Sequence, residues 1–175
     1  MSNFGLIMAE EIINRVEKSG LVQINLDEFY PQGERVLFDI AEFLHEGLIL
    51  IEKDFRDKVK NTDWQQFDGK YVAVNCSADA IVPLWAFMLV VSQLKPFAKN
   101  VVMGNQQDLE KAIFNQLFDK HDFAQYQDKN VIVKGCGHHP IPESVFVDFT
   151  YRLQNVAKNI MFGEACSAVP LFKRK

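Results

Sequence analysis

The sequence predicts an α/β protein: a doubly wound, mainly parallel four-stranded sheet built from two similar β-α-β units and preceded by an N-terminal α+β extension. The first observation is an internal repeat, in which residues 64–104 resemble residues 123–163. The second is the alternation of short apolar runs with segments of helical period over residues 71–162, which is typical of parallel strands joined by right-handed crossovers. The extension is expected to span residues 1–63 and the α/β domain residues 64–175.

The repeat is visible residue by residue. Residues 67–76 and 126–136 both contain an aromatic residue, a turn, a lysine, a β-branched run and a cysteine, with one inserted residue beside the second cysteine. The ends of the two copies also match, and Pro83 and Pro142 lie at the same offset. A proline in the first turn of a helix costs no hydrogen bond, so both positions predict a helix start.

The extension begins with a helix that we expect over residues 4–18, where apolar side chains recur at helical spacing. Two strands follow, over residues 21–26 and 34–39, with a turn at residues 30–33 between them. Because the connection is short and carries Pro and Gly, we expect these strands to form a small antiparallel ribbon.

Two helices are expected in the rest of the extension. Asp39 is suited to cap a short helix over residues 40–46, and residues 52–60 have charged and apolar sides. The four apolar residues 48–51 suit either a buried strand or the start of the next helix, and their period does not decide between them.

The α/β domain contains continuous apolar strands, as expected when helices cover both faces of a sheet. The expected strands are residues 71–75, 100–103, 130–134 and 159–162, and the expected helices are residues 83–97, 107–120 and 142–157. The helix over residues 83–97 is apolar almost all round, so the extension, the tail or a second subunit is expected to cover its outer side. The tail, residues 164–175, has no helical period.

Composition excludes some classes of partner. The formal net charge is −4 and the isoelectric point about 5.6, which do not favour binding to nucleic acid or to an anionic membrane. The longest apolar run, residues 80–91, is shorter than a membrane span. Three cysteines without an export signal predict reduced thiols in the cytoplasm.

Each cysteine is expected at a strand end. Cys76 follows the strand at residues 71–75, Cys136 follows that at residues 130–134, and Cys166 comes shortly after the last strand. Ligands of doubly wound sheets bind at the carboxyl ends of the strands, where the strand order reverses. With the order 2-1-3-4, Cys76 and Cys136 face each other across that crevice, with Cys166 within reach.

Three interpretations of these thiols remain open. They are buried fillers of the core, as free cysteines often are. Alternatively, all three bind zinc or an iron–sulfur cluster, with His138 or His139 as a further ligand. In the third, Cys76 is a reactive thiol before a helix N-terminus, accompanied by Ser77 and Asp79.

Further polar residues lie near the same rim. Glu143 and Glu164 suit acid–base chemistry or ligand binding, but acids are also ordinary in a first helical turn. The Gly135-x-Gly137 segment is not a dinucleotide fingerprint, because Pro140 stands where the third glycine belongs, and no P-loop is present. His45 and His121 lie in charged surroundings and are expected to be solvated.

The chain resembles an uncharacterised bacterial family, domain of unknown function 2480, which is typical of Bacteroidetes. Four segments carry the resemblance, namely residues 33–39, 76–86, 134–137 and 163–171. The family has proline where Ala165 stands and threonine where Ala168 stands, and it often lacks histidine at positions 138 and 139. No activity is established for it. Its genes often lie near iron–sulfur assembly genes, which implies a thiol or metal role.

Taken together, we expect a cytoplasmic protein whose cysteines bind a metal or carry sulfur in iron–sulfur or thiol metabolism. Iron–sulfur assembly proteins are then expected partners. The alternative is a non-enzymatic homodimeric interaction module in which the apolar helix over residues 83–97 builds the interface and the cysteines pack inside. Neither the residues nor their spacing identify a reaction or show that the protein is an enzyme.

Overall fold

The computed structural model describes residues 20–135 and 137–175, so the helix expected over residues 4–18 lies outside the described residues. The described chain is α/β, as predicted, with four α-helices, a parallel three-stranded sheet and a mixed four-stranded sheet. It divides into two compact units. The larger unit contains residues 26–122 and 137–151, and the smaller unit contains the other described residues.

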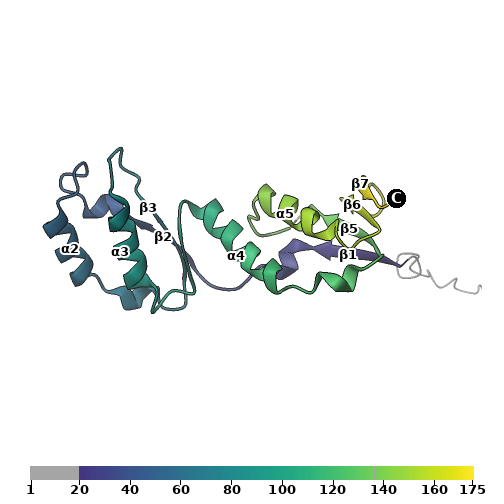
Figure 1. Ribbon diagram of the computed structural model, residues 1–175, viewed down its shortest axis with the longest axis horizontal. Coiled ribbons are helices and arrows are strands. Elements are labelled where there is room, and N and C mark those ends of the chain that lie inside the picture. Colours follow the sequence, from purple (N-terminus) through teal and green to yellow (C-terminus); the bar gives the residue numbers. More distant parts are fainter. Residues whose placement is uncertain (1–19, 136) are drawn as a thin grey trace, which may run out of the picture. The chain divides into compact units, whose positions relative to one another are not determined.

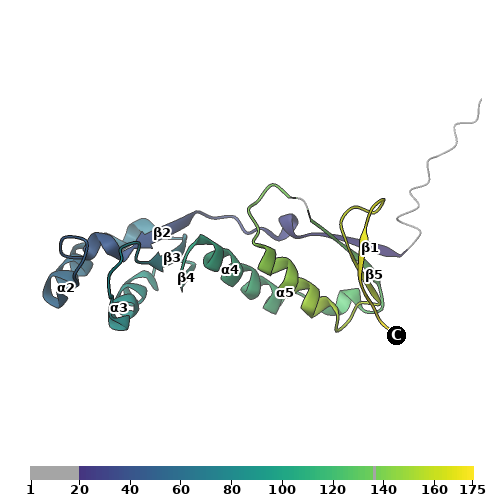
Figure 2. The same cartoon turned by 90° about the horizontal axis from the view of Figure 1, so that it is seen from above.

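The larger unit is built on the three-stranded sheet. Its strands are β2 (Arg35–Asp39), β3 (Tyr71–Asn75) and β4 (Asn100–Met103), in the order β2-β3-β4 and all parallel (Figure 2). Helix α3 (Leu84–Leu94) connects β3 to β4. This is the first β-α-β unit predicted from the repeat.

Helices cover both faces of this sheet (Figure 1). Val72 and Val74 point into a core shared with α2 (Glu52–Asn61) and α3. Between them, Ala73 points to the opposite face and packs against α4 (Gln106–Lys120). Since fully burying a valine-sized side chain contributes about 1.5–3 kcal/mol, the apolar run of β3 stabilises both layers.

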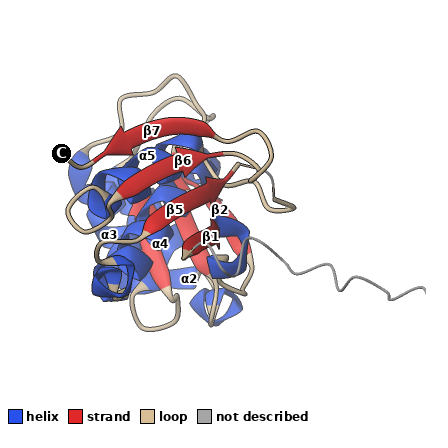
Figure 3. Ribbon diagram, turned by 90° about the vertical axis from the view of Figure 1, so that its right-hand side faces the viewer, coloured by secondary structure: helices blue, strands red, loops and turns tan. Residues whose placement is uncertain are grey.

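The smaller unit contains the four-stranded sheet (Figure 3). Strands β1 (Leu21–Asn25), β5 (Asn130–Lys134) and β6 (Asn159–Phe162) are parallel, and β7 (Val169–Lys173) pairs antiparallel with β6. Helix α5 (Glu143–Leu153) connects β5 to β6 but belongs mostly to the larger unit. The guanidinium of Arg174 holds the end of the chain through a 2.7 Å ion pair with Asp128.

Two predictions about strand pairing were wrong. The two β-α-β units do not share one sheet, because β3 and β4 belong to one sheet and β5 and β6 to the other. Strands β1 and β2 do not form an antiparallel ribbon either, since β1 pairs parallel with β5 and β2 pairs parallel with β3. An apolar period identifies a strand, but its partner depends on long-range packing that the period does not encode.

The strands with which β1 and β2 pair show that the repeat is longer than predicted. Residues 22–29 and 36–43 match as Val-Gln-Ile-Asn-Leu-Asp-Glu-Phe and Val-Leu-Phe-Asp-Ile-Ala-Glu-Phe. Each segment forms a strand followed by a 3-10 helix, Leu26–Phe29 in one case and Ile40–Phe43 in the other. Each sheet therefore contains the same three-stranded arrangement, in which an outer strand pairs with a β-α-β unit.

Other local expectations are confirmed or corrected. Asp39 caps the following helix as predicted, accepting a hydrogen bond from the amide of Ala41, but this helix is a short 3-10 helix. Pro83 is the N-cap of α3 and lies just before its first turn. The tail contains β7, in which Pro170 is accommodated because β7 lies at the edge of the sheet. Within the described ranges, no helix combines the length and the apolar character needed to cross a membrane.

Candidate functional site

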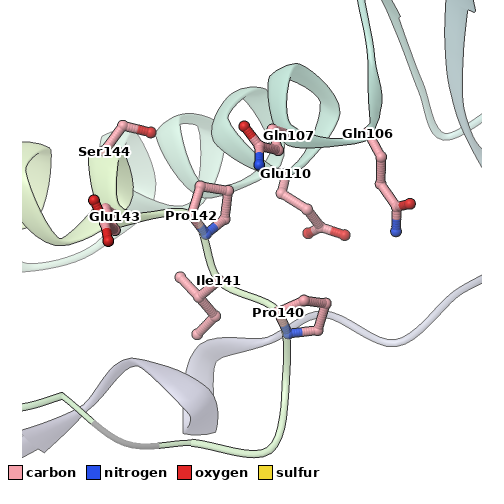
Figure 4. Close-up of a pocket in the computed structure, with 8 residues that line it drawn as sticks. All are labelled: Gln106, Gln107, Glu110, Pro140, Ile141, Pro142, Glu143 and Ser144. Atoms are coloured by element: carbon pink, nitrogen blue, oxygen red, sulfur yellow. The ribbon is translucent and has the colours of Figure 1, made fainter.

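A pocket of about 620 Å³ lies within the larger unit (Figure 4). Gln106, Gln107 and Glu110 from the start of α4 form one wall, and the segment from Pro140 to Ser144 forms the other. In Figure 4, Gln106 and Glu110 project from α4 towards this segment. Cavities of this size bind small molecules, and the lining combines amide, hydroxyl and carboxylate groups with apolar proline and isoleucine side chains.

Glu110 is the most buried acid of the described chain, with a side chain only 1% exposed. Its Oε1 accepts hydrogen bonds from Nε of Arg35 at 2.9 Å and from the hydroxyl of Tyr30 at 2.7 Å. Arg35 also donates from Nη1 to two carbonyls of the β1–β2 connection, those of Pro31 and Gly33. The charge of Glu110 is therefore paired inside the protein.

A column of rings and cations surrounds this ion pair. The imidazole of His139 stacks on the ring of Tyr30 with 4.0 Å between centroids. The guanidinium of Arg35 lies 4.2 Å from the Tyr30 ring and 4.9 Å from the Tyr71 ring, and Nζ of Lys99 lies 5.4 Å from the Tyr71 ring. Such contacts contribute about 0.5–2 kcal/mol each when partly desolvated, so this column holds Arg35 in place.

Gly33 is required next to this column. Its φ is +140°, which disfavours other residues, and a Cβ at this position would lie 2.8 Å from the Tyr71 ring. A side chain here would displace the ring that packs on the Arg35 guanidinium.

Asp27 fixes the segment that carries His139. One carboxylate oxygen accepts hydrogen bonds from the amides of His138 and His139 at 2.9 and 2.8 Å and lies 2.9 Å from Nδ1 of His139. The backbone hydrogen bond from His139 is the main cause that lowers the pKa of Asp27. Gly137 permits this approach, because a Cβ there would lie 2.5 Å from the same oxygen.

The hydrogen bonds of Tyr30 and His139 depend on where their protons lie. Burial, followed by the hydrogen bond to Glu110, raises the pKa of Tyr30 to about 12. The phenol therefore stays protonated at neutral pH and remains a donor to Glu110. Since an ionised carboxylate only accepts, Nδ1 of His139 is the donor in its contact with Asp27.

The electrostatics of the pocket do not favour an anion. Asn105 accepts hydrogen bonds from the amides of Gln107 and Asp108, and Asp108 accepts one from the amide of Asn105, so a capping box occupies the N-terminus of α4. None of the described residues that line the pocket is a lysine or an arginine. Because Arg35 neutralises Glu110, the remaining charge of the lining is the carboxylate of Glu143.

The structure distributes the predicted site residues over both units. Of these residues, Glu143 lines the pocket. Ser77 donates from its amide and hydroxyl to Asp39 at the carboxyl end of the three-stranded sheet. The amide of His138 belongs to the Asp27 cluster, Asp79 is exposed, and Glu164 forms a 3.7 Å ion pair with Lys134.

The strand order from which the thiol cluster was predicted is wrong, because β3, which precedes Cys76, and β5, which precedes Cys136, belong to different sheets. The cluster itself stays a prediction. Cys136 itself lies outside the described residues. Cys76 is half-buried against the core of the larger unit and its Sγ lies 3.7 Å from the carbonyl of Ala78, whereas Cys166 is exposed. Among residues 20–135 and 137–175, no group of three potential metal ligands occurs.

The sequence did not predict the network of contacts around Glu110, namely Asp27, Tyr30, Arg35 and Glu110. One signal was present for Glu110. It lies three and four residues before the buried Ile113 and Phe114, so it falls on the apolar side of α4. An acid at such a position requires a buried partner.

Comparison with known proteins identifies a family. A family model described as "Protein of unknown function (DUF2480)" matches residues 10–174, almost the whole chain. No curated protein and no solved structure matches the chain.

Proposed function

We propose that this chain, which belongs to the DUF2480 family, is a binding protein for a small polar molecule, held in the pocket between α4 and residues 140–144. One observation carries the proposal: the pocket is lined by Glu110, a buried acid that is hydrogen-bonded to Arg35 behind the lining. Replacing a buried ion pair by apolar residues is often neutral or stabilising, so stability alone is a weak reason for this pair. A charged network beside a cavity is a common property of functional sites.

The lining indicates the class of ligand. Gln106, Gln107 and Ser144 offer both donors and acceptors, and Glu143 adds a negative charge. With the amides at the start of α4 already bonded to Asn105, a neutral ligand or one with an amino group is favoured over a phosphate or carboxylate. Pro140 and Ile141 provide an apolar surface for the carbon skeleton of such a molecule.

The test is a thermal-shift screen with separate panels of neutral amides and sugars, amines, and anionic metabolites, followed by titration calorimetry. A ligand at about 100 times its Kd stabilises the protein by about 2.7 kcal/mol. We expect hits among neutral compounds or amines, and we expect Glu143→Gln to weaken an amine by about tenfold, as loss of a charge-assisted hydrogen bond does.

Glu164→Gln is the matched control, because it removes a carboxylate of the smaller unit. It should leave ligand affinity unchanged. Hits confined to anions, or equal effects of the two substitutions, would contradict the proposal.

A thiol function is a second and separate proposal. The observation that favours it is the exposed thiol of Cys166, which is accessible to a metal ion or a sulfur donor. We propose that Cys166, with Cys136 and Cys76, carries sulfur or binds zinc or an iron–sulfur cluster supplied by iron–sulfur assembly proteins. Elemental analysis and a visible spectrum of anaerobically purified protein test this. Stoichiometric metal lost in Cys136→Ala and Cys166→Ala supports metal binding, and no metal with unreactive thiols rejects both versions.

A further inference from the structure

The two sheets have the same strand arrangement, with one difference. In each, an outer strand pairs with the first strand of a β-α-β unit, giving the orders β1-β5-β6 and β2-β3-β4. In the smaller unit β6 also pairs antiparallel with β7. In the larger unit β4 corresponds to β6, and in the part of the chain that the structure describes β4 is the last strand of its sheet (Figure 2).

The composition of β4 does not protect this edge. Its sequence, Asn100-Val101-Val102-Met103, contains no proline and no charge, which are the usual devices that prevent edge pairing. The faces of β4 are already used, since Val101 packs in the core with α3 and Val102 packs on the side of α4. The backbone groups along its outer edge are therefore the part left to pair.

Residues of β4 are more exposed than the matching residues of β6, which pairs with β7. Ile160 of β6 is fully buried, whereas the corresponding Val101 of β4 is only partly buried. Met103 is 61% exposed and its counterpart Phe162 is 38% exposed. An additional strand beside β4 would remove apolar surface from water and pair backbone groups at the same time.

We propose that β4 pairs antiparallel with β4 of a second copy of the chain, which joins two three-stranded sheets into one. A two-fold axis relates two identical strands in antiparallel orientation, so the same surface of each copy forms the interface. It also reproduces the orientation of β7 on β6. This inference does not depend on the ligand pocket.

The dipoles of the α4 helices are complementary under this symmetry. Helix α4 begins just after β4 and packs back over β4 and β3, so it runs antiparallel to β4. The two-fold axis therefore places two α4 helices on the same face in opposite directions. The first turn of α4 in one copy and the last turn of α4 in the other then come to the same side, so opposite ends of the two helix dipoles lie together.

The experiment is sedimentation velocity over a concentration series with the full chain. We expect a monomer–dimer equilibrium that Met103→Lys weakens by about tenfold, because a lysine on an edge strand opposes pairing. Met88→Lys is the matched control. Met88 is exposed to a similar degree, 64%, but belongs to helix α3 and not to the edge strand, so this change should leave dimerisation unaltered.

Hydrogen exchange provides a second measurement on the unmodified protein. Amides of residues 100–103 should become more protected as concentration rises, whereas those of α2 should not change. A wild-type chain that stays monomeric, a dimer that Met88→Lys disrupts and Met103→Lys does not, or β4 amides whose protection is independent of concentration would each overturn the proposal.

Discussion

Substituting glutamine for Glu110 tests the buried ion pair most directly. The change keeps the size of the side chain but leaves the guanidinium of Arg35, only 10% exposed, without its counter-charge. Breaking a buried pair by removing one partner costs about 3–5 kcal/mol. Glutamine can still accept a hydrogen bond from Tyr30, so we expect the free energy of unfolding to fall by about 3 kcal/mol, at the lower end of that range.

Urea unfolding followed by tryptophan fluorescence measures this loss. Trp64 and Trp85 both belong to the larger unit, so the signal reports on the unit that contains the pair. Glu34→Gln is the matched control, because Glu34 forms a 2.9 Å ion pair with Lys70 but is 62% exposed. An exposed pair of this kind contributes at most about 1 kcal/mol.

Equal destabilisation by Glu110→Gln and Glu34→Gln would contradict a larger contribution of the buried pair. A double variant, Arg35→Met with Glu110→Met, adds a second criterion. With both charges removed, no uncompensated ion remains, so this variant should be more stable than Glu110→Gln alone.

Three further predictions concern protons and thiols. The pKa of Tyr30 is raised from 10.0 to about 12. The contribution of the protonated phenol to stability is therefore full below pH 10 and is lost as the pH rises through 12. Tyr30→Phe should flatten alkaline unfolding curves over this range. For Asp39, burial raises the pKa, but hydrogen bonds from Ser77 and Ala41 outweigh it and lower the pKa below 3.8. Its contribution is therefore present above pH 3.8 and lost as the pH falls through the lowered value, so Asp39→Asn should unfold less steeply in acid, and an unchanged slope would contradict the assignment. In a Cys136→Ser background, Ellman's reagent should modify Cys166 rapidly and Cys76 only slowly, because Cys76 packs against the core; equal rates would refute the difference in burial.

Local features of the sequence determined much of this protein. The apolar run of β3, the paired copies of the β-α-β unit and the capping role of Asp39 are all readable from neighbouring residues, because periodicity and capping act over a few positions. The same features placed the chain in the α/β class, and short motifs such as residues 163–171 were enough to indicate its family.

Only the tertiary structure decided which strands pair and which polar residues meet. Strands β1 and β2 are close in the chain yet join different sheets, because each fits beside the first strand of a different repeat. Glu110 meets Arg35 across 75 residues of sequence, and no local pattern specifies that contact. Pairing of this kind depends on shape and burial summed over the whole unit, whereas helices and strands follow from the side chains of each segment.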